Sequence, residues 1–382
     1  MKIATITPMT YTKGELNYFQ FIRGSVGADC HQGPSFYEFK DGKVLLSWGA
    51  YDIQECSGDT ASLYCTTTDM GITWTDPQII NFLSGVPERE IIQLKNSNDA
   101  LSFGVVTRHN LVVDIKTKKV TSSSNYFKAS TRAYLRRSND GGNTFGLPED
   151  IPYQLISGGK ELKNVGFYAG IDNSLQLKSG RIMVAYTFMD PERIGKANDW
   201  QAQHYTGACI LSDDGGKTWR RSQEIVSNTQ RGVMEIQMVE TTPDNILAIF
   251  RSKSGYVRQT ISKDGGQTWS ESVDSPLAAP ESMTRMIKLK SGNILLTRNN
   301  ACSKTQHPRY PIVATISKDG GKTWSKDKII ATEIGSNQLS NHSMIQLDDG
   351  RILHAISHYR SVFPVTSDLD MAIYDEDWVL KE

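Results

Sequence analysis

The stretch ISKDGGQTW at residues 261–269 decides the fold of this 382-residue chain, because it recurs almost unchanged as ISKDGGKTW at 316–324. Three looser copies precede these two, and all five fit the pattern Ser/Thr-x-Asp-x-Gly-x-Thr-Trp/Phe. The looser copies are TTDMGITW at 67–74, SNDGGNTF at 138–145 and SDDGGKTW at 212–219. A motif that returns along the whole chain at intervals of some tens of residues indicates a repeat architecture, such as a propeller or an array.

The chemistry of the motif is that of a turn. An Asp side chain can accept hydrogen bonds from backbone N–H groups about two residues further on, and Gly permits a positive φ. The Thr ties the loop a second time, and the aromatic residue is expected to insert into apolar surface beneath it. We interpret the motif as a folding device between two strands. A calcium loop, the functional alternative, would need more carboxylates in each copy.

A second pattern precedes the turns and is found six times. It is an alternating run of apolar and polar residues, broken by a short turn and followed by another run. Such period-2 alternation with β-branched and aromatic residues predicts a strand–turn–strand hairpin. The six copies are SFYEFKDGKVLLSW (35–48), IIQLKNSNDALSFGVV (91–106), NSLQLKSGRIMVAYTF (173–188), MVETTPDNILAIFR (238–251), RMIKLKSGNILLTR (285–298) and SMIQLDDGRILHAISH (343–358).

Together the two patterns predict an all-β fold, a six-bladed β-propeller that forms a single domain over residues 1–382. The sixth unit ends in DLDMAIYDEDWVL (368–380), which reads as strand without the turn motif. The opening segment MKIATIT (1–7) is expected to pair with this last blade and close the ring. The insertions 107–134 and 189–204 are expected to be loops over one face.

Composition excludes several classes of function. Lys plus Arg and Asp plus Glu both number 42, so the net charge is zero, which argues against a nucleic-acid partner. No apolar run approaches the roughly 20 residues of a membrane span. No signal peptide is visible at the start, so the cellular compartment stays open, as does the oligomeric state.

The five cysteines are Cys30, Cys56, Cys65, Cys209 and Cys302. Their number is odd and no pair has the spacing of metal ligands, so we expect no metal site and no cofactor. Their simplest interpretation is that of small buried hydrophobic residues, with a Cys30–Cys56 or Cys30–Cys65 bridge as the alternative.

The turn motif resembles the Asp-box, or BNR repeat, of the sialidase superfamily, and the resemblance covers nearly the whole chain. The Asp-box also occurs in propellers that are not enzymes, so it indicates the fold and leaves the function open. The resemblance implies a site at the propeller axis. In the family that site has three arginines that clamp a sialic acid carboxylate, a Tyr nucleophile activated by a Glu, and an Asp acid/base.

Two parts of this site have good matches. The stretch MEIQMVETTPDNILAIFR (234–251) is similar to the family's E-x-Q-x-V-E-L segment, which is followed by an Arg sixteen residues after the first Glu. The resemblance therefore places Glu235 at the family's Glu and Arg251 at the second clamp arginine. Arg309 lies ten residues before Asp319 of the fifth turn motif and matches the third clamp arginine.

Two other parts of the site depart from the family. In CHQGPSFYEFKDG (30–42), Gln32 stands where the first arginine is expected, and in NHSMIQLDDG (341–350), Asn341 stands at the position of the Tyr nucleophile. The resemblance thus puts the family's retaining mechanism in doubt. For the acid/base, Asp59 is the best equivalent, with the neighbouring loop acids as substitutes.

Several further residues are expected near the axis because they stand at the starts of inner strands. His31 and His342 are adjacent to the two departures, and a His can act as a general acid or base near neutral pH. Residues expected to shape the substrate pocket are Tyr168, Asp172 and Arg285, with Arg89 and Glu281.

These features lead us to expect a carbohydrate-active enzyme, an exo-acting glycoside hydrolase on an acidic or deoxy sugar of an oligo- or polysaccharide. Two arginines can still hold a carboxylate, and a His with Glu235 or Asp59 could drive hydrolysis. One alternative is a polysaccharide lyase, in which His31 or His342 would abstract a C5 proton from a uronate. The other is a non-catalytic glycan-binding propeller.

Overall fold

The computed structural model describes residues 6, 9–23, 30–51, 60–80, 90–108, 111–113, 120–122, 130–160, 169–189, 204–333, 338–362 and 365–382. Nearly all regular structure in this part of the chain is strand. Its two helices, α1 (Tyr153–Ser157) and α2 (Glu376–Leu380), have five residues each. The all-β prediction is therefore confirmed. No helix in the described ranges has the length and apolar character needed to cross a membrane.

Four separate four-stranded antiparallel sheets follow one another along the chain, each meandering from strand to strand. Their strands are β6 (Glu90–Gln93), β7 (Ala100–Arg108), β10 (Ser130–Ser138) and β11 (Glu149–Asp150); β12 (Ala169–Gln176), β13 (Ile182–Met189), β14 (Tyr205–Ser212) and β15 (Arg220–Arg221); β16 (Met234–Thr242), β17 (Asn245–Arg251), β18 (Tyr256–Ser262) and β19 (Val273–Ala278); and β20 (Arg285–Lys288), β21 (Ile294–Asn299), β22 (Ile312–Ser317) and β23 (Lys328–Ala331).

A fifth, eight-stranded sheet combines the two ends of the chain. It contains β24 (Gln338–Gln346), β25 (Ile352–Val362), β26 (Val365–Tyr374) and β1 (Asn17–Ile22), together with β2 (Cys30–Glu38), β3 (Val44–Tyr51), β4 (Thr60–Thr67) and β5 (Gln78–Ile79). Its two halves are joined by one parallel pair, Cys30 with Ser367.

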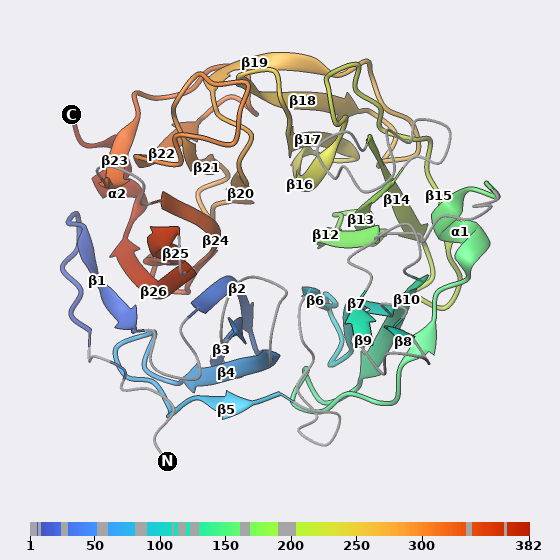
Figure 1. Ribbon diagram of the computed structural model, residues 1–382, viewed down its shortest axis with the longest axis horizontal. Coiled ribbons are helices and arrows are strands. Elements are labelled where there is room, and N and C mark those ends of the chain that lie inside the picture. Colours follow the sequence, from blue (N-terminus) through green and yellow to red (C-terminus); the bar gives the residue numbers. More distant parts are fainter. Residues whose placement is uncertain are drawn as a thin grey trace.

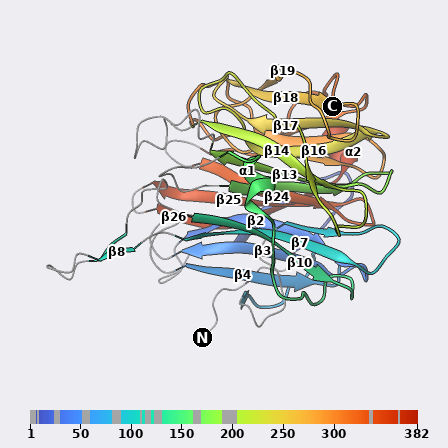
Figure 2. The ribbon, with the colours of Figure 1, turned by 90° about the vertical axis from the view of Figure 1, so that its right-hand side faces the viewer.

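The sheets are arranged around a common middle in chain order (Figure 1), and the first strand of each hairpin, such as β12 or β16, lies toward that middle. All six predicted hairpins are present, as the pairs β2–β3, β6–β7, β12–β13, β16–β17, β20–β21 and β24–β25. The insertion predicted over 107–134 contains a small hairpin, β8 (Leu111–Val113) with β9 (Val120–Ser122). Figure 2 shows β8 projecting away from the sheets.

The closure of the last sheet differs from the prediction at both ends of the chain. The strand that pairs with β26 is β1, with Asn17 opposite Ile373, whereas the predicted segment 1–7 lies outside the described residues except for Ile6. The segment 368–380 is not strand throughout. Strand β26 stops at Tyr374, and the side chain of Asp375 accepts the N–H of Trp378 at 2.8 Å and so caps α2. An Asp at this position favours a helix start over a continued strand.

The repeated motif forms a turn, as predicted. The Asp side chain accepts from a residue four positions further on, whereas about two positions were expected. In the fourth copy, Asp264 Oδ1 accepts the N–H of Thr268 at 2.9 Å, and Oδ2 accepts the hydroxyl of the same Thr at 2.5 Å. The hydroxyl of Ser262 donates to Asp264 Oδ1 at 2.8 Å and accepts the N–H of Gly266, also at 2.8 Å. The Asp thus closes a turn over four residues, and the other four copies repeat these bonds.

Each turn also fastens its sheet to the preceding one. A methyl group built on Gly266 would lie 2.1 Å from Cε of Met183 in the preceding sheet, so only Gly permits this approach. The equivalent glycines of the other turns meet preceding side chains in the same way; these contacts are Gly71 with Leu353, Gly142 with Tyr37, Gly216 with Leu101 and Gly321 with Leu247. The motif is therefore a connection between neighbouring sheets as well as a turn.

Hydrophobic clusters fill the spaces between successive sheets. Phe103 of β7 and Tyr186 of β13, both fully buried, belong to one cluster, while Trp269 packs with strands of the preceding sheet in another. Burying one such side chain contributes roughly 1.5–3 kcal/mol. These interfaces hold the inner strands in place and so position the side chains at the ends of those strands.

The cysteines are as expected in three cases. Cys30, Cys65 and Cys209 are buried free thiols, so the Cys30–Cys65 bridge is not formed. Cys302 is exposed, which contradicts its interpretation as a buried hydrophobic residue. Cys56 lies outside the described residues.

Candidate active site

Four inner strands are interrupted near their beginnings by a β-bulge. An extra residue in one strand bends it locally and redirects a side chain. The register shifts lie between Gln32 and Ser35 in β2, Ile171 and Asn173 in β12, Met234 and Gln237 in β16, and Ser340 and His342 in β24. These bulges stand where the inner strands enter the sheets, and the candidate residues gather around them.

Two of the bulges hold a non-glycine residue in the left-handed region. Glu235 has a φ of 54° and Asn341 a φ of 45°. Such conformations cost about 1–3 kcal/mol each and persist only where the surroundings impose them, a situation that is common at functional sites. Glu235 is thereby separated from the regular pleat of β16, and its side chain is 27% exposed.

The structure brings the predicted pair Glu235 and Arg251 together. Arg251 ends β17, pairs with Met234 across the hairpin, and donates from Nη1 to Oε1 of Glu235 at 3.0 Å. Arg251 is 8% exposed. Oε2 of Glu235 has no hydrogen-bond partner within the described ranges. One carboxylate oxygen is therefore held by an arginine, while the other is buried and has no partner in these ranges.

A buried carboxylate, Glu281, lies behind this pair. Its side chain is fully buried, its Oε1 is in an ion pair with Arg231, and the same oxygen is 3.8 Å from Nη2 of Arg251. Arg231 is 1% exposed and lies 5.6 Å from the ring of Tyr205. Sequence reasoning named Glu281 only as a cavity residue and missed Arg231. The sequence signal that could have indicated Arg231 is the Arg-Gly pair just before β16. In the structure both residues of this pair have a positive φ.

Arg309 and Arg285 extend the cationic group toward β24. Arg309 donates from Nη2 to the carbonyl of Glu281 at 3.5 Å and from Nη1 to the hydroxyl of Ser340 at 3.3 Å. Arg285 donates from Nε to the carbonyl of His342 at 2.7 Å. The two arginines therefore flank Asn341, one contacting the residue before it and the other the residue after it.

Asp172 and Glu90 approach the site from the preceding sheets. Oδ2 of Asp172 accepts the N–H of Ile236, the residue after Glu235, at 3.2 Å. Burial raises the pKa of Asp172 well above its usual range, the bond from Ile236 opposes this rise, and the charge of Glu235 adds to it. Burial also raises the pKa of Glu90, whose Oε1 accepts the N–H and hydroxyl of Ser174 at 2.6 and 2.8 Å. No sequence motif pointed to Glu90, which stands at the start of the short strand β6.

The side chains of both predicted histidines are buried within the sheets. Nδ1 of His342 is 2.9 Å from Nε2 of His354 and 3.3 Å from the hydroxyl of Thr297, and burial lowers the pKa of His342 to about 3, with a further lowering by Arg285. His31 is fully buried, and its Nδ1 accepts the indole N–H of Trp48 at 3.0 Å.

The physical reason is the bulges. Successive strand side chains point to opposite faces, so a shift of one residue reverses which of two neighbours faces which way. The histidines consequently pack into the interior, while their neighbours Gln32 and Asn341 approach each other, with Asn341 Nδ2 3.5 Å from Gln32 Oε1.

Two predicted residues, Asp59 and Tyr168, lie outside the described residues, as does Arg89.

The family comparison rests on the repeats and on this fold. The BNR repeat-like domain matches residues 115–355. The chain belongs to the BNR repeat-like domain family. It is a divergent member of the sialidase superfamily. A curated relative, a sialidase of Bacteroides fragilis (strain YCH46), is 29% identical over 214 residues, which cover 53% of this chain and 35% of that relative. The chain thus spans about a third of the relative's length.

Solved structures of the sialidase superfamily share the fold. The NanB sialidase of Streptococcus pneumoniae is similar with a TM-score of 0.66 at 16% identity, over 94% of this chain and 70% of that chain. The intramolecular trans-sialidase of Ruminococcus gnavus gives 0.66 at 15% identity, over 94% and 96%. A protein of unknown function from Dyadobacter fermentans gives 0.68 at 18% identity, over 94% and 98%. At these identities the likeness concerns the fold alone.

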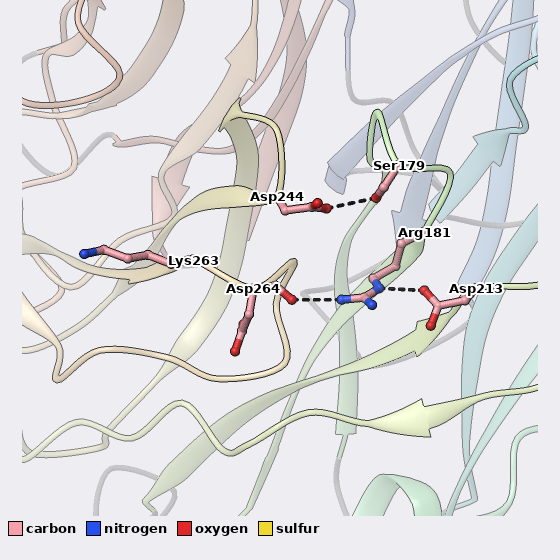
Figure 3. Close-up of a pocket in the computed structure, with 6 residues that line it drawn as sticks. All are labelled: Ser179, Arg181, Asp213, Asp244, Lys263 and Asp264. Atoms are coloured by element: carbon pink, nitrogen blue, oxygen red, sulfur yellow. Dashed lines mark hydrogen bonds and ion pairs between the residues drawn. The ribbon is translucent and has the colours of Figure 1, made fainter.

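Another polar region of this sialidase-superfamily chain lies at the opposite end of the same strands. Figure 3 shows the side chains that line a hollow of about 260 Å³ there, which are Ser179, Arg181, Asp213, Asp244, Lys263 and Asp264. Ser179 donates to Asp244 at 2.9 Å, and Arg181 donates to Asp213 at 2.6 Å and to the carbonyl of Asp264 at 2.9 Å. Because these groups bind one another, we interpret this hollow as part of the connection between sheets.

Proposed function

We propose that the protein is an exo-acting glycoside hydrolase that acts on a glycan containing an acidic sugar. The observation that carries this proposal is the contact of Arg251 with Glu235, next to Asp172, whose carboxylate accepts the N–H of Ile236. The family membership supports a glycan-acting enzyme, and the named activity and substrate are our inference.

The scaffold we propose is a six-bladed β-propeller. The four separate sheets supply four blades. The eight-stranded sheet divides naturally into two further blades, β24–β25–β26–β1 and β2–β3–β4–β5, because one parallel residue pair connects them. In such a ring the starts of the inner strands converge on the axis, which is where the bulges and the candidate residues stand.

The charges at this end favour a carboxylate ligand. Arg231 and Arg251 face one fully buried carboxylate, Glu281, and Arg251 also binds the partly exposed carboxylate of Glu235. Arg309 contacts the backbone carbonyl of Glu281, and Arg285 contacts the backbone carbonyl of His342. Burial raises the pKa of Asp172 and of Glu90, which disfavours the charged forms of these two carboxyls. Arginines bind carboxylates with short, directional hydrogen bonds, so an acidic sugar such as a uronate fits the site.

Two carboxyl groups supply the acid and the base. Burial raises the pKa of Asp172, which favours its role as the acid that donates a proton to the glycosidic oxygen as the bond to the leaving group breaks. Glu235, which accepts from Arg251, is our candidate for the base that takes a proton from the water that forms the new C–O bond. Such a division of roles between two carboxyl groups is typical of glycoside hydrolysis. Asp59 stays a second candidate for the acid from the sequence.

The experiment is hydrolysis of a panel of acidic oligosaccharides in water enriched in ¹⁸O, followed by mass spectrometry. The panel contains sialosides, uronates and neutral sugars linked to uronates. We expect products with one added ¹⁸O and loss of turnover in Glu235→Gln. The matched control is Glu271→Gln, an exposed Glu of the same sheet, which should keep full activity.

Other outcomes would contradict the proposal in distinct ways. An unsaturated product without ¹⁸O would indicate a lyase. Binding of a ligand by calorimetry without any product would indicate a glycan-binding protein. Turnover that persists in Glu235→Gln would mean that the chemistry lies elsewhere in the chain.

A further inference from the structure

Two buried histidines of paired strands, His342 of β24 and His354 of β25, contact each other directly. Nδ1 of His342 is 2.9 Å from Nε2 of His354, and both side chains are at most 1% exposed. The hydroxyl of Tyr374 in β26 lies 3.2 Å from Nδ1 of His354. On the opposite side, Nε2 of His342 lies 3.4 Å from the carbonyl of Met283. We call the side chains of Tyr374, His354 and His342 the histidine line.

The histidine line has one arrangement of protons when both rings are neutral. A carbonyl only accepts, so Nε2 of His342 carries the proton that bonds to Met283, and Nδ1 of the same ring accepts. Nε2 of His354 then donates to that Nδ1, which leaves Nδ1 of His354 to accept the hydroxyl of Tyr374. Another hydroxyl, that of Thr297, also lies 3.3 Å from Nδ1 of His342. The bonds therefore run in one direction, from β26 to the carbonyl of Met283.

The histidine line ends at the segment that carries Arg285. Met283 is two residues before Arg285, and Nε of Arg285 donates back to the carbonyl of His342 at 2.7 Å. The start of β20 and the bulge of β24 are thus joined by two bonds in opposite directions, one from each side. These inner strands lie next to each other (Figure 1). The two bonds together restrict the position of Arg285 more than either bond could alone.

The neutral state of the rings suits this arrangement. Burial lowers the pKa of both histidines, that of His342 to about 3, and the charge of Arg285 lowers both further. A proton added to His342 would turn its Nδ1 into a donor and would reverse the bonds of the line. It would also place a second positive charge beside Arg285. The neutral pair avoids both effects.

We propose that the histidine line is a positioning device for Arg285. In this device His354 sets the single tautomer of His342, and His342 holds Arg285 at the place where that arginine meets an acidic ligand. Both histidines act through Arg285, because their side chains are buried. The part of this inference that concerns the ligand rests on the proposed function, whereas the part that concerns Arg285 does not.

Nuclear magnetic resonance tests the positioning without a substrate. In protein labelled with ¹⁵N at arginine, the Nε–H signal of Arg285 is assigned by its loss in Arg285→Lys. We expect its exchange with water to quicken about tenfold or more in His354→Leu, which removes both ring nitrogens. His354→Gln should restore slow exchange, because its amide can donate to His342 and its carbonyl can accept from Tyr374.

Tyr374→Phe is a milder second variant, since it removes only the hydroxyl at the far end of the line. We expect a smaller increase in the exchange of Arg285, together with a second tautomer of His354 in two-bond ¹H–¹⁵N spectra of the histidine rings. The matched control is Tyr64→Phe, whose hydroxyl bonds to Gln78 at an exposed position. It should change neither measurement.

Unchanged exchange of Arg285 in both His354→Leu and Tyr374→Phe, or a loss that His354→Gln does not restore, would overturn the positioning role. On an acidic glycan that the protein hydrolyses, KM should rise about tenfold in His354→Leu while kcat changes less than about threefold. A fall in kcat at unchanged KM would overturn the ligand part. Absence of turnover on every glycan would reject the proposed function and the ligand part with it, while faster exchange in the variants would keep the positioning of Arg285.

Discussion

The two ends of the inner strands are both polar, yet they are built differently. At one end the Asp turns repeat the same bonds five times, and at the other the bulges carry a different residue in each sheet, such as Asp172, Glu235 or Asn341. The turns satisfy their own aspartates. The bulges leave buried atoms such as Glu235 Oε2 and Gln32 Nε2 without partners in the described ranges. Repetition therefore marks the parts that hold the fold, and departure from it marks the parts that we propose bind a ligand.

The largest effect we expect comes from the bulge end. Asp172→Asn should lower kcat about 10²- to 10⁴-fold, because an amide cannot donate the proton that the leaving oxygen needs. Melting temperature should not fall, since the amide removes a carboxyl that burial disfavours in its charged form. Steady-state kinetics and thermal unfolding measure the two. Asp99→Asn, in an exposed hairpin turn, is the control. An equal loss of kcat in this variant would contradict the assignment of the chemistry to the bulge end of the strands.

The same Asp predicts the alkaline limb of the pH profile. Burial raises the pKa of Asp172, so its proton is lost at a higher pH than that of an ordinary Asp. We expect kcat/KM to fall on that side and the limb to vanish in the residual activity of Asp172→Asn. A limb that is unchanged in the variant would assign the acid to another group, with Asp59 the first to be examined.

The next effect concerns the support behind the site. Glu281→Gln leaves the buried Arg231 without its counter-charge, and breaking such a pair costs about 3–5 kcal/mol. KM for acidic substrates should also rise, because the carboxylate of Glu281 lies 3.8 Å from Nη2 of Arg251 and helps to position that arginine. Urea unfolding and KM measured on the folded fraction test this. A stable variant with unchanged KM would show that the arginines are held by other contacts.

A smaller effect is expected at the turn end. Asp264→Ala removes the bonds to Thr268 and Ser262 and should lower stability by about 1–2 kcal/mol. KM and kcat should be unchanged because the turn lies at the far end of the strands. Asp99→Ala provides the comparison. Loss of activity at full stability would contradict the separation of the two ends.

The smallest effect is a dependence of stability on acid. Hydrogen bonds from Thr144 and Ser138 lower the pKa of Asp140 to about 2, and those from Thr323 do the same for Asp319. The folded carboxylates stay ionised below the ordinary Asp value, so their contribution is complete above about pH 4 and is lost as pH falls toward 2. Calorimetric scans from pH 5 to pH 2 should show the melting temperature declining in this window. Asp140→Asn should decline less; an identical slope would mean that other carboxylates dominate.

The fold was predictable because its information is local and repeated. Each hairpin, such as 285–298, carries its own alternation and turn, and each Asp turn carries its own acceptors. Glu235 and Arg251 were likewise predictable, since one hairpin with a fixed register holds both.

The rest depends on events that the sequence does not mark. A bulge shifts the register by one residue, and the residue types in Ser340-Asn341-His342 were not enough to predict where this shift occurs. His342 was therefore assigned to the axis although it lies in the interior. Arg231 and Glu281 meet across 50 positions of the chain, and Asp172 meets Ile236 across 64. Such pairings depend on how neighbouring sheets pack against one another. The order of residue types along the chain does not specify that packing.

The pairing of β1 with β26 has a consequence for the order in which the chain is made. Asn17 pairs with Ile373, which is synthesised about 350 residues later. At roughly 5–20 residues per second of synthesis, the first strand stays without its partner for about 20 to 70 s. Its residues Phe21 and Ile22, fully buried in the finished protein, can meet early partners of their hydrophobic cluster such as Trp48 during that time, whereas Leu369 and Met371 of the same cluster come last. The backbone of β1 thus gains its partner strand only when the final part of the chain has been made.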